Sequence, residues 1–117
     1  MKIIKFNCKN WDDKKGYSKR VLLNDKELRK PGVFIQEVKI KPKDKSALHH
    51  HKKQTEIFYF LSSNGHWIIN DKKVKPNVGD ILVIEPGDIH STINDTNEKY
   101  LYLCFKIDYD SNDLYWE

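Results

Sequence analysis

Between residues 33 and 107 the sequence repeats one pattern, in which a short apolar segment is followed by a turn signal and then by another apolar segment. Residues 33–40 and 100–107 alternate between two faces at period two, which is typical of β-strands. No stretch carries the pattern of a long amphipathic helix. Strands of this length at such regular spacing predict an all-β protein, either a β-sandwich or a barrel.

Further strands are expected between these two segments. They are residues 56–61, 66–69, 81–84 and 90–93. Residues 70–73 suit a hairpin connection and residues 85–88 suit a turn, because both contain residues that favour turns. Residues 56–61 are apolar at nearly every position, so we expect this strand to be covered on both faces.

The chain length bounds the domain organisation. With 117 residues the chain can form one domain but not two, so we expect a single domain over residues 1–117. Its core should span about residues 33–107. Residues 1–32 should add short strands and a turn, while the acidic and aromatic tail of residues 108–117 either frays or packs across a neighbour.

The N-terminal segment has weaker signals. Lys2–Phe6 is expected to form a short edge strand and Tyr17–Leu23 another. Residues 24–30 are expected to form one helical turn, which Pro31-Gly32 ends.

Charge argues against a nucleic-acid partner. The net charge is +4, but most basic residues are lysines interspersed with acidic residues, and the arginines are Arg20 and Arg29. Surfaces that bind phosphates usually cluster basic residues and include arginine. The composition, 38% hydrophobic and 32% charged, is that of an ordinary globular protein. We therefore expect the charge to serve solvation.

The sequence also bounds the location of the protein. No apolar run approaches the length of a membrane-spanning helix, and the N-terminus lacks the apolar segment and cleavage site of a secretion signal. We therefore expect no membrane association and a cytoplasmic location. Cys8 and Cys104 suit two free, buried thiols better than a disulfide framework, and a single bridge between them stays open as an alternative.

The strongest functional signal is the run of three histidines at residues 49–51. Because alternate residues of a strand point to the same side, His49 and His51 share one face while the residue between them points away. Glu56 can project from the adjoining strand, and His90 can enter from a strand distant in the sequence. Three imidazoles and one carboxylate suit one divalent metal ion, such as zinc, iron, manganese, nickel or copper. We therefore predict that these four side chains form a metal site.

Strand alternation also predicts what surrounds this site. Phe58 and Phe60 should point inward with the glutamate, and we interpret them as barrel core rather than as a substrate-selective wall. Thr92 and Asn94 share a face with His90. They are therefore candidates to orient a ligand imidazole.

Each signal has a simpler interpretation. A run of histidines also occurs on exposed turns, in the manner of a purification tag, and a single histidine after Pro-Gly is more often a surface residue. His50 and His66 are not expected to be ligands. Gln36, Tyr102 and Lys106 could reach the mouth of the cavity, but their orientation relative to the metal does not follow from the sequence, so each is interpreted as ordinary strand polarity.

With these residues the sequence resembles the cupins, a family of small β-barrels recognised by two motifs. The first motif contains two histidines separated by one residue, a glutamate a few positions on and a turn glycine, which here are His49, His51, Glu56 and Gly65. The second contains a glycine, a short strand, a Pro-Gly turn, a histidine and an asparagine, which here are Gly79, Pro86, Gly87, His90 and Asn94. The resemblance covers about residues 33–107, and the two motifs together are specific.

Two turn positions depart from the family pattern. Ser63 stands where the first motif usually has its turn glycine, with Gly65 supplying a later turn glycine, and Glu85 stands where the second often has its first proline. These departures affect turn geometry and leave the ligands in place. The resemblance implies a double-stranded β-helix, the jelly-roll barrel of the cupins. It also implies a homodimer, because residues 56–61 are apolar on both sides and one barrel covers only the inner face.

The resemblance further implies a function. We expect a metal-dependent enzyme of the isomerase, decarboxylase or dioxygenase type that acts on a small polar molecule, such as a sugar, a sugar acid or a keto acid. The alternative is a non-catalytic module that binds a small molecule or a metal. A metal-free histidine base, as in epimerases and ketoisomerases of similar fold, is disfavoured by the full set of four ligands.

Overall fold

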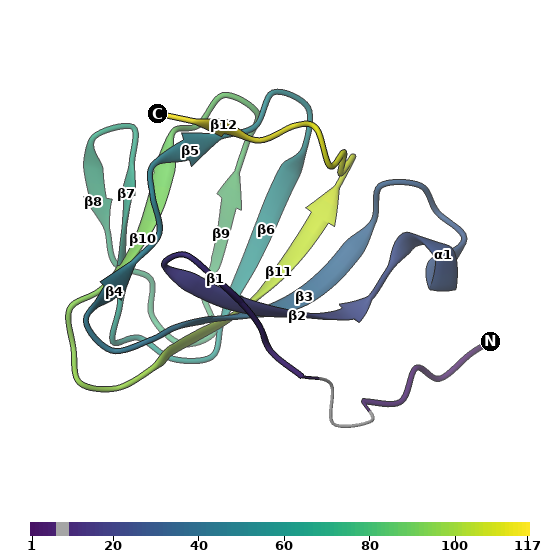
Figure 1. Cartoon of the computed structure of the whole chain (residues 1–117), viewed down its shortest axis with the longest axis horizontal. Helices are drawn as coiled ribbons and strands as arrows, with labels where there is room; N and C mark the ends of the chain where they lie inside the picture. The colour runs from purple at the N-terminus through teal and green to yellow at the C-terminus, as the bar shows by residue number, and fades with distance from the viewer. Residues whose placement is uncertain (7–9) are drawn as a thin grey trace.

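In the computed structural model, which describes residues 1–6 and 10–117, nearly all regular structure is β-strand in two antiparallel sheets (Figure 1). The first sheet runs in the order β1-β2-β3-β11-β6-β9. Its strands are β1 (Asp12–Lys14), β2 (Tyr17–Leu23), β3 (Phe34–Ile40), β6 (Thr55–Phe60), β9 (Ile81–Ile84) and β11 (Tyr100–Ile107).

The second sheet runs in the order β12-β5-β10-β7-β8, with β4 beside β10. Its strands are β4 (Asp44–Lys45), β5 (His49–His50), β7 (His66–Ile69), β8 (Lys72–Val74), β10 (His90–Asn94) and β12 (Tyr115–Trp116). Strands that are distant in the sequence lie side by side, as β3, β11 and β6 do in Figure 1. The prediction of an all-β jelly-roll barrel is therefore confirmed.

β11 shows how strand alternation builds the core. Tyr102 lies opposite Val38 of β3 and opposite Phe60 of β6, and all three are buried. The even-numbered residues of β11 from Tyr100 to Cys104 thus face inward, on one of the two faces that the alternation defined. The other buried core residues are Ile40, Phe58, Trp67, Ile84, Tyr100 and Cys104.

The helical turn expected after β2 is confirmed as α1 (Asp25–Leu28). Its N-cap is Asn24, whose side-chain oxygen accepts a hydrogen bond of 2.9 Å from the amide of Glu27. The Glu27 side chain in turn accepts one of 3.2 Å from the amide of Asn24. This reciprocal capping box satisfies two amide groups that the first turn of a helix leaves free.

The strand expected at Lys2–Phe6 is wrong, because these residues are exposed and have no regular structure. β1 occupies the edge of the sheet next to β2, pairing Asp13 with Ser18, so β2 has no free edge for residues 2–6. Cys8 lies outside the described residues. Cys104 is a free, buried thiol, as expected.

The residues of two connections follow from the backbone conformation and the packing at those positions. Asn70 and Asp71 join β7 to β8 with positive φ angles of 49° and 68°, the backbone of a two-residue hairpin turn. Gly65 precedes β7, and an added Cβ there would clash with the ring of Tyr100. Close packing of this buried ring therefore explains the glycine.

The C-terminal tail packs against its own barrel. Tyr115 lies opposite His50, and Trp116 lies opposite His49, so β12 extends the second sheet (Figure 1). The amide of Glu117 donates a hydrogen bond of 3.1 Å to the carbonyl of Leu48. The tail thus lies next to the histidine segment.

Within one chain, β6 is covered on its inner face only. Phe58 and Phe60 are buried, whereas Tyr59 on the outer face is 39% exposed. A single barrel therefore covers only the inner face of this strand, as expected. Among the described residues, no helix has the length and apolar character to cross a membrane.

Candidate metal centre

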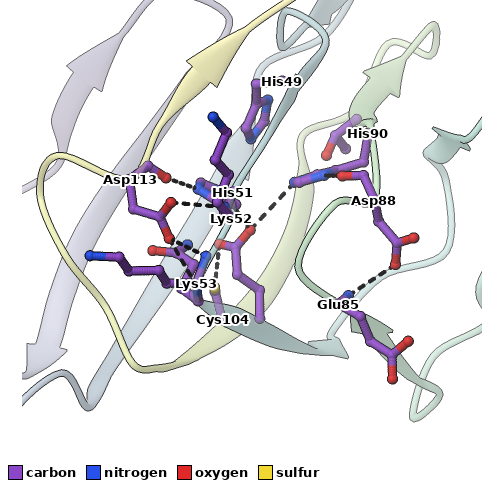
Figure 2. Close-up of polar contacts among 12 residues, drawn as sticks. His49, His51, Lys52, Lys53, Glu85, Asp88, His90, Cys104 and Asp113 are labelled. Atoms are coloured by element: carbon purple, nitrogen blue, oxygen red, sulfur yellow. Dashed lines mark hydrogen bonds and ion pairs between the residues drawn. The ribbon is translucent and has the colours of Figure 1, made fainter.

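The fold brings together the four residues predicted to bind a metal. His49 and His51 lie on and just after β5, Glu56 on β6 and His90 on β10, and their ligand atoms all lie within 4.8 Å of one another. The ring centroid of His49 is 4.2 Å from that of His90 and 5.3 Å from that of His51. Figure 2 shows the three imidazoles gathered in one space. A group of this kind can hold a metal ion.

A backbone carbonyl fixes each imidazole from behind. The distances from Nδ1 to the carbonyl oxygen are 2.8 Å from His49 to Ala47, 2.6 Å from His51 to Asp113 and 2.8 Å from His90 to Asp88. Because a carbonyl can only accept, Nδ1 must carry the proton, and Nε2 of a neutral ring is left with its lone pair. The three rings thus direct Nε2 atoms into the shared space.

The turn before β10 positions His90. The amide of Glu85 donates to the carboxylate of Asp88 at 2.9 Å, and the amide of Asp88 donates to the carbonyl of Glu85 at 3.1 Å (Figure 2). Gly87, with a φ of +93°, donates its amide to the carbonyl of His51 at 2.7 Å. The turn therefore forms with Glu85 in place of the usual proline. Its hydrogen bond to His51 holds the turn that precedes His90 next to residues 49–51.

A thiol orients the carboxylate of the site. Cys104 on β11 donates to Oε2 of Glu56 at 3.4 Å, and both side chains are buried. The other oxygen, Oε1, lies 3.1 Å from Nε2 of His51 and 3.4 Å from Nε2 of His90. The thiol thus holds the carboxylate with one oxygen facing the imidazoles.

Two atoms of this cluster are buried without a hydrogen-bond partner among the described residues. Nε2 of His51 and Oε1 of Glu56 are only 3.1 Å apart, yet they are not aligned for a hydrogen bond. Unsatisfied polar atoms are costly inside a protein, and a cation bound by both would satisfy them. The residues present therefore fit a divalent metal ion.

Burial and neighbouring groups set the charges of the cluster. Burial, with a smaller contribution from His90, lowers the pKa of His49 to about 4. Burial alone raises the pKa of Glu56, but His51 and His90 hold that pKa well below its ordinary value. Burial lowers the pKa of His51, but Glu56 and the carbonyl of Asp113 together raise it above its ordinary value, so a metal ion must compete with a proton at that ring.

Thr92 and Asn94 do not orient the imidazoles, contrary to expectation. Oγ1 of Thr92 lies 3.1 Å from the hydroxyl of Tyr102. The side-chain amide of Asn94 donates to backbone carbonyls, including that of Glu98 at 2.7 Å. Each site imidazole lies at the end of a strand or just beyond it, where carbonyls of the adjoining turn or tail are within reach, and these take the orienting role.

The remaining histidines lie outside the cluster, as expected. His50 bonds to the side chain of Glu117 and stacks on Tyr115 with a centroid distance of 5.3 Å. His66 is partly exposed at the start of β7.

A cavity of about 150 Å³ adjoins the four residues. Phe58 lines it. Gln36, Tyr102 and Lys106 line it too, so their interpretation as ordinary strand polarity is wrong. The register explains this, because Lys106 lies opposite Glu56 and so faces the same side of the sheet. The lining residues that the sequence interpretation missed include Lys19, Gln54, Asp113 and Trp116.

Asp113 connects the tail to the metal centre. Its carboxylate accepts hydrogen bonds from the amides of Lys52, Lys53 and Gln54 at 2.8, 2.8 and 2.9 Å (Figure 2). Its backbone carbonyl is the acceptor for Nδ1 of His51. The tail therefore holds both the loop after β5 and one candidate ligand.

The cupin domain profile matches residues 36–106, which is more than half of the chain and includes all four cluster residues. The chain belongs to the cupin family. This cupin is 28% identical over 83 residues to an oxalate-binding protein of Thermotoga maritima, a match that covers 71% of this chain and 69% of that protein.

Solved structures share the fold. A "predicted oxalate decarboxylase" from Thermotoga maritima has a TM-score of 0.80 at 21% identity, with 91% of this cupin and 98% of that chain covered. KdgF from Halomonas sp. has a TM-score of 0.79 at 14% identity, with 96% of this cupin and 97% of that chain covered. The polyketide cyclase RemF from Streptomyces resistomycificus has a TM-score of 0.81 at 15% identity, with 99% of this cupin and 84% of that chain covered. At these identities the structures establish the fold and nothing further.

Proposed function

We propose that this cupin binds a divalent metal ion through His49, His51, Glu56 and His90 and acts as a metal-dependent enzyme on a small polar molecule. The observation that carries the proposal is the convergence of four ligand atoms within 4.8 Å beside a cavity. A divalent ion bound there supplies a Lewis acid for chemistry of the isomerase, decarboxylase or dioxygenase type. The side chains hold and orient the ion, while Phe58 helps exclude water.

The size of the cavity supports a small substrate. About 150 Å³ is close to the volume of an engineered cavity that accommodates benzene. The relative named an oxalate-binding protein supports including oxalate among the candidates, next to sugar acids and keto acids.

Turnover of this panel tests the proposal. Product formation should be measured with the metal that copurifies, for the wild type and for His51→Ala. The proposal expects product from the wild type and a loss of activity in the variant. Activity that survives His51→Ala would remove the metal from the mechanism.

A second candidate is a binding module without turnover. The relative's name, which describes binding, favours it. A rise in thermal unfolding temperature with a panel compound, without any product, would support this candidate over the enzyme.

Cys104 is expected to tune the metal affinity through Glu56. Cys104→Ala removes the donor to Oε2, so the affinity for zinc should fall by about 10-fold, as is usual when a group that orients a ligand is lost. Cys104→Ser keeps a donor and should retain most of the affinity. Chelator competition measures the zinc affinity of the wild type and of both variants. Equal affinities would show that the thiol does not position the carboxylate.

A homodimer is part of the same proposal. Tyr59 on β6 and Ile81 on β9 lie opposite each other and are 39% and 65% exposed, and Val83 continues this apolar face at 48%. A second copy that packs there would cover the outer face of the sheet. Analytical ultracentrifugation at micromolar concentration should show a dimer.

Substitutions check which face forms the dimer. The double variant Ile81→Glu/Val83→Glu should sediment as a monomer. Ile3→Glu changes another exposed apolar residue, away from the sheet, and should remain a dimer. A monomeric wild type would contradict the proposal.

A cytoplasmic location also belongs to the proposal. The free, buried thiol of Cys104 is compatible with a reducing compartment. Cell fractionation should recover the protein with cytoplasmic markers, and recovery outside the cytoplasm would contradict this part of the proposal.

A further inference from the structure

Besides Glu56, the inner face of the first sheet carries three polar residues where a barrel core is usually apolar. Lys106 of β11 lies opposite Glu56, and Gln36 of β3 lies opposite Cys104, two residues before Lys106. Lys19 lies on β2, the next strand of the sheet. All three line the cavity, so they form a polar diagonal that starts beside the metal centre and crosses β11, β3 and β2.

The two lysines of this diagonal interact with carboxylates only at a distance, since Lys106 lowers the pKa of Glu56 and Asp12 raises that of Lys19. Neither forms an ion pair with any described residue, and the ammonium of Lys106 lies 4.7 Å from the ring centre of Tyr109. Burial, and after it the charge of Lys106, lowers the pKa of Lys19. Two like charges thus face a partly buried space. Glu56 is the anion beside Lys106, and a metal ion bound by Glu56 would offset its charge, so a further anion between the lysines is favoured.

The other carboxylates of the cavity wall are already engaged. Asp110 forms an ion pair of 3.6 Å with the ammonium of Lys53. Asp113 accepts hydrogen bonds from three backbone amides. Neither neutralises the lysines of the diagonal.

Two buried carboxamides point to the same kind of ligand. Gln54 is 2% exposed, and its Nε2 has no hydrogen-bond partner among the described residues. Gln36 is 6% exposed, and its side chain makes no hydrogen bond within the described part of the chain. The buried amide of Gln54 needs an acceptor, the amide of Gln36 is free to donate into the cavity, and a carboxylate supplies oxygen atoms that only accept.

We propose that the cavity binds a small dicarboxylate, with one carboxylate at the metal centre and the other between Lys19 and Lys106, where Gln36 donates a hydrogen bond. This inference rests on the proposed metal site and narrows the substrate class from small polar molecules to dianions. A neutral sugar would supply no charge to pair with either ammonium group, so the site discriminates against it. Lysines act as point charges, so charge matters here more than a fixed planar geometry.

Calorimetric titration of the zinc-loaded protein tests the inference. Oxalate, malonate and succinate serve as dicarboxylates of increasing length, and acetate serves as the monocarboxylate. At least one dicarboxylate should bind about 10-fold more tightly than acetate, since a charge-assisted contact is added. Lys19→Gln and Lys106→Gln should each weaken that binding by about 10-fold, while the exposed Lys72→Gln, with the same change of charge, should leave it unchanged.

Two further measurements separate the possible failures. Chelator competition should give similar zinc affinities for the lysine variants and the wild type, and thermal unfolding should show that they fold. If the wild type binds no zinc, the metal proposal fails. The proposed binding of a dicarboxylate at the metal and at the two lysines then fails with it. If zinc binds but no dicarboxylate exceeds acetate, or the three lysine variants behave alike, the inference is overturned while the metal proposal stands.

Discussion

His90→Ala is expected to lower the affinity for zinc by at least about 100-fold, because losing a group that merely orients a ligand already costs about 10- to 100-fold. The imidazole of His90 is held by the carbonyl of Asp88, so its Nε2 needs little rearrangement to bind a cation. Glu56→Gln should cause a loss of similar size, because it keeps the shape of the side chain but removes its negative charge.

Chelator competition with purified metal-free protein measures these affinities. His66→Ala is the matched control, because this histidine lies outside the cluster and is partly exposed. Thermal unfolding of the metal-free proteins should show that every variant folds. A His90→Ala affinity that falls no further than that of His66→Ala would remove His90 from the site.

Asp113→Ala is expected to lower the free energy of unfolding of the metal-free protein by about 3 kcal/mol. Its carboxylate accepts three amide hydrogen bonds, and bonds to a charged group contribute about 1.5–3 kcal/mol each without being additive. The same substitution frees the tail whose carbonyl orients His51, so zinc affinity should also fall, by about 10-fold.

Urea denaturation in the presence of a chelator measures the stability change. Asp95→Ala is the control, because it removes the same charge from an exposed position. Its effect should stay within about 0.5 kcal/mol, as for most surface substitutions. If Asp113→Ala behaves like this control, the tail does not anchor the loop after β5.

The parts of the fold that could be predicted are those with a local signal. Alternation at period two marked β3 and β11, and the two histidine motifs identified residues that the barrel brings within 4.8 Å. Such signals work because a strand fixes the direction of each side chain. Lys2–Phe6 could not be predicted in this way. Whether a short apolar segment becomes a strand depends on a free edge of the sheet, and β1 already pairs with the edge of β2.

The role of the tail lacked such a signal. Asp113 acts through hydrogen bonds to amides about sixty positions earlier in the chain, and a contact of that kind leaves no periodic pattern around either partner. An acidic tail is equally compatible with a solvated end. Cys104 was likewise expected to be buried, but its contact with Glu56 depends on the pairing of β11 with β6.

The lining of the cavity could be predicted in part. Alternation separated two faces of β11 but did not say which one faces the metal. The register that sets Lys106 opposite Glu56 decides this, and register between strands far apart in sequence is a property of the whole barrel. Gln36 and Lys19 follow from the same pairing, through β3 and then β2.

The central claim is that His49, His51, Glu56 and His90 together bind a metal ion. Elemental analysis of protein purified without a histidine tag and without added metal tests it most directly. The account predicts a single divalent ion per wild-type chain and its loss in Glu56→Gln. A wild-type protein that carries no metal and takes none up after dialysis against zinc would contradict the account, as would an equal metal content in both proteins.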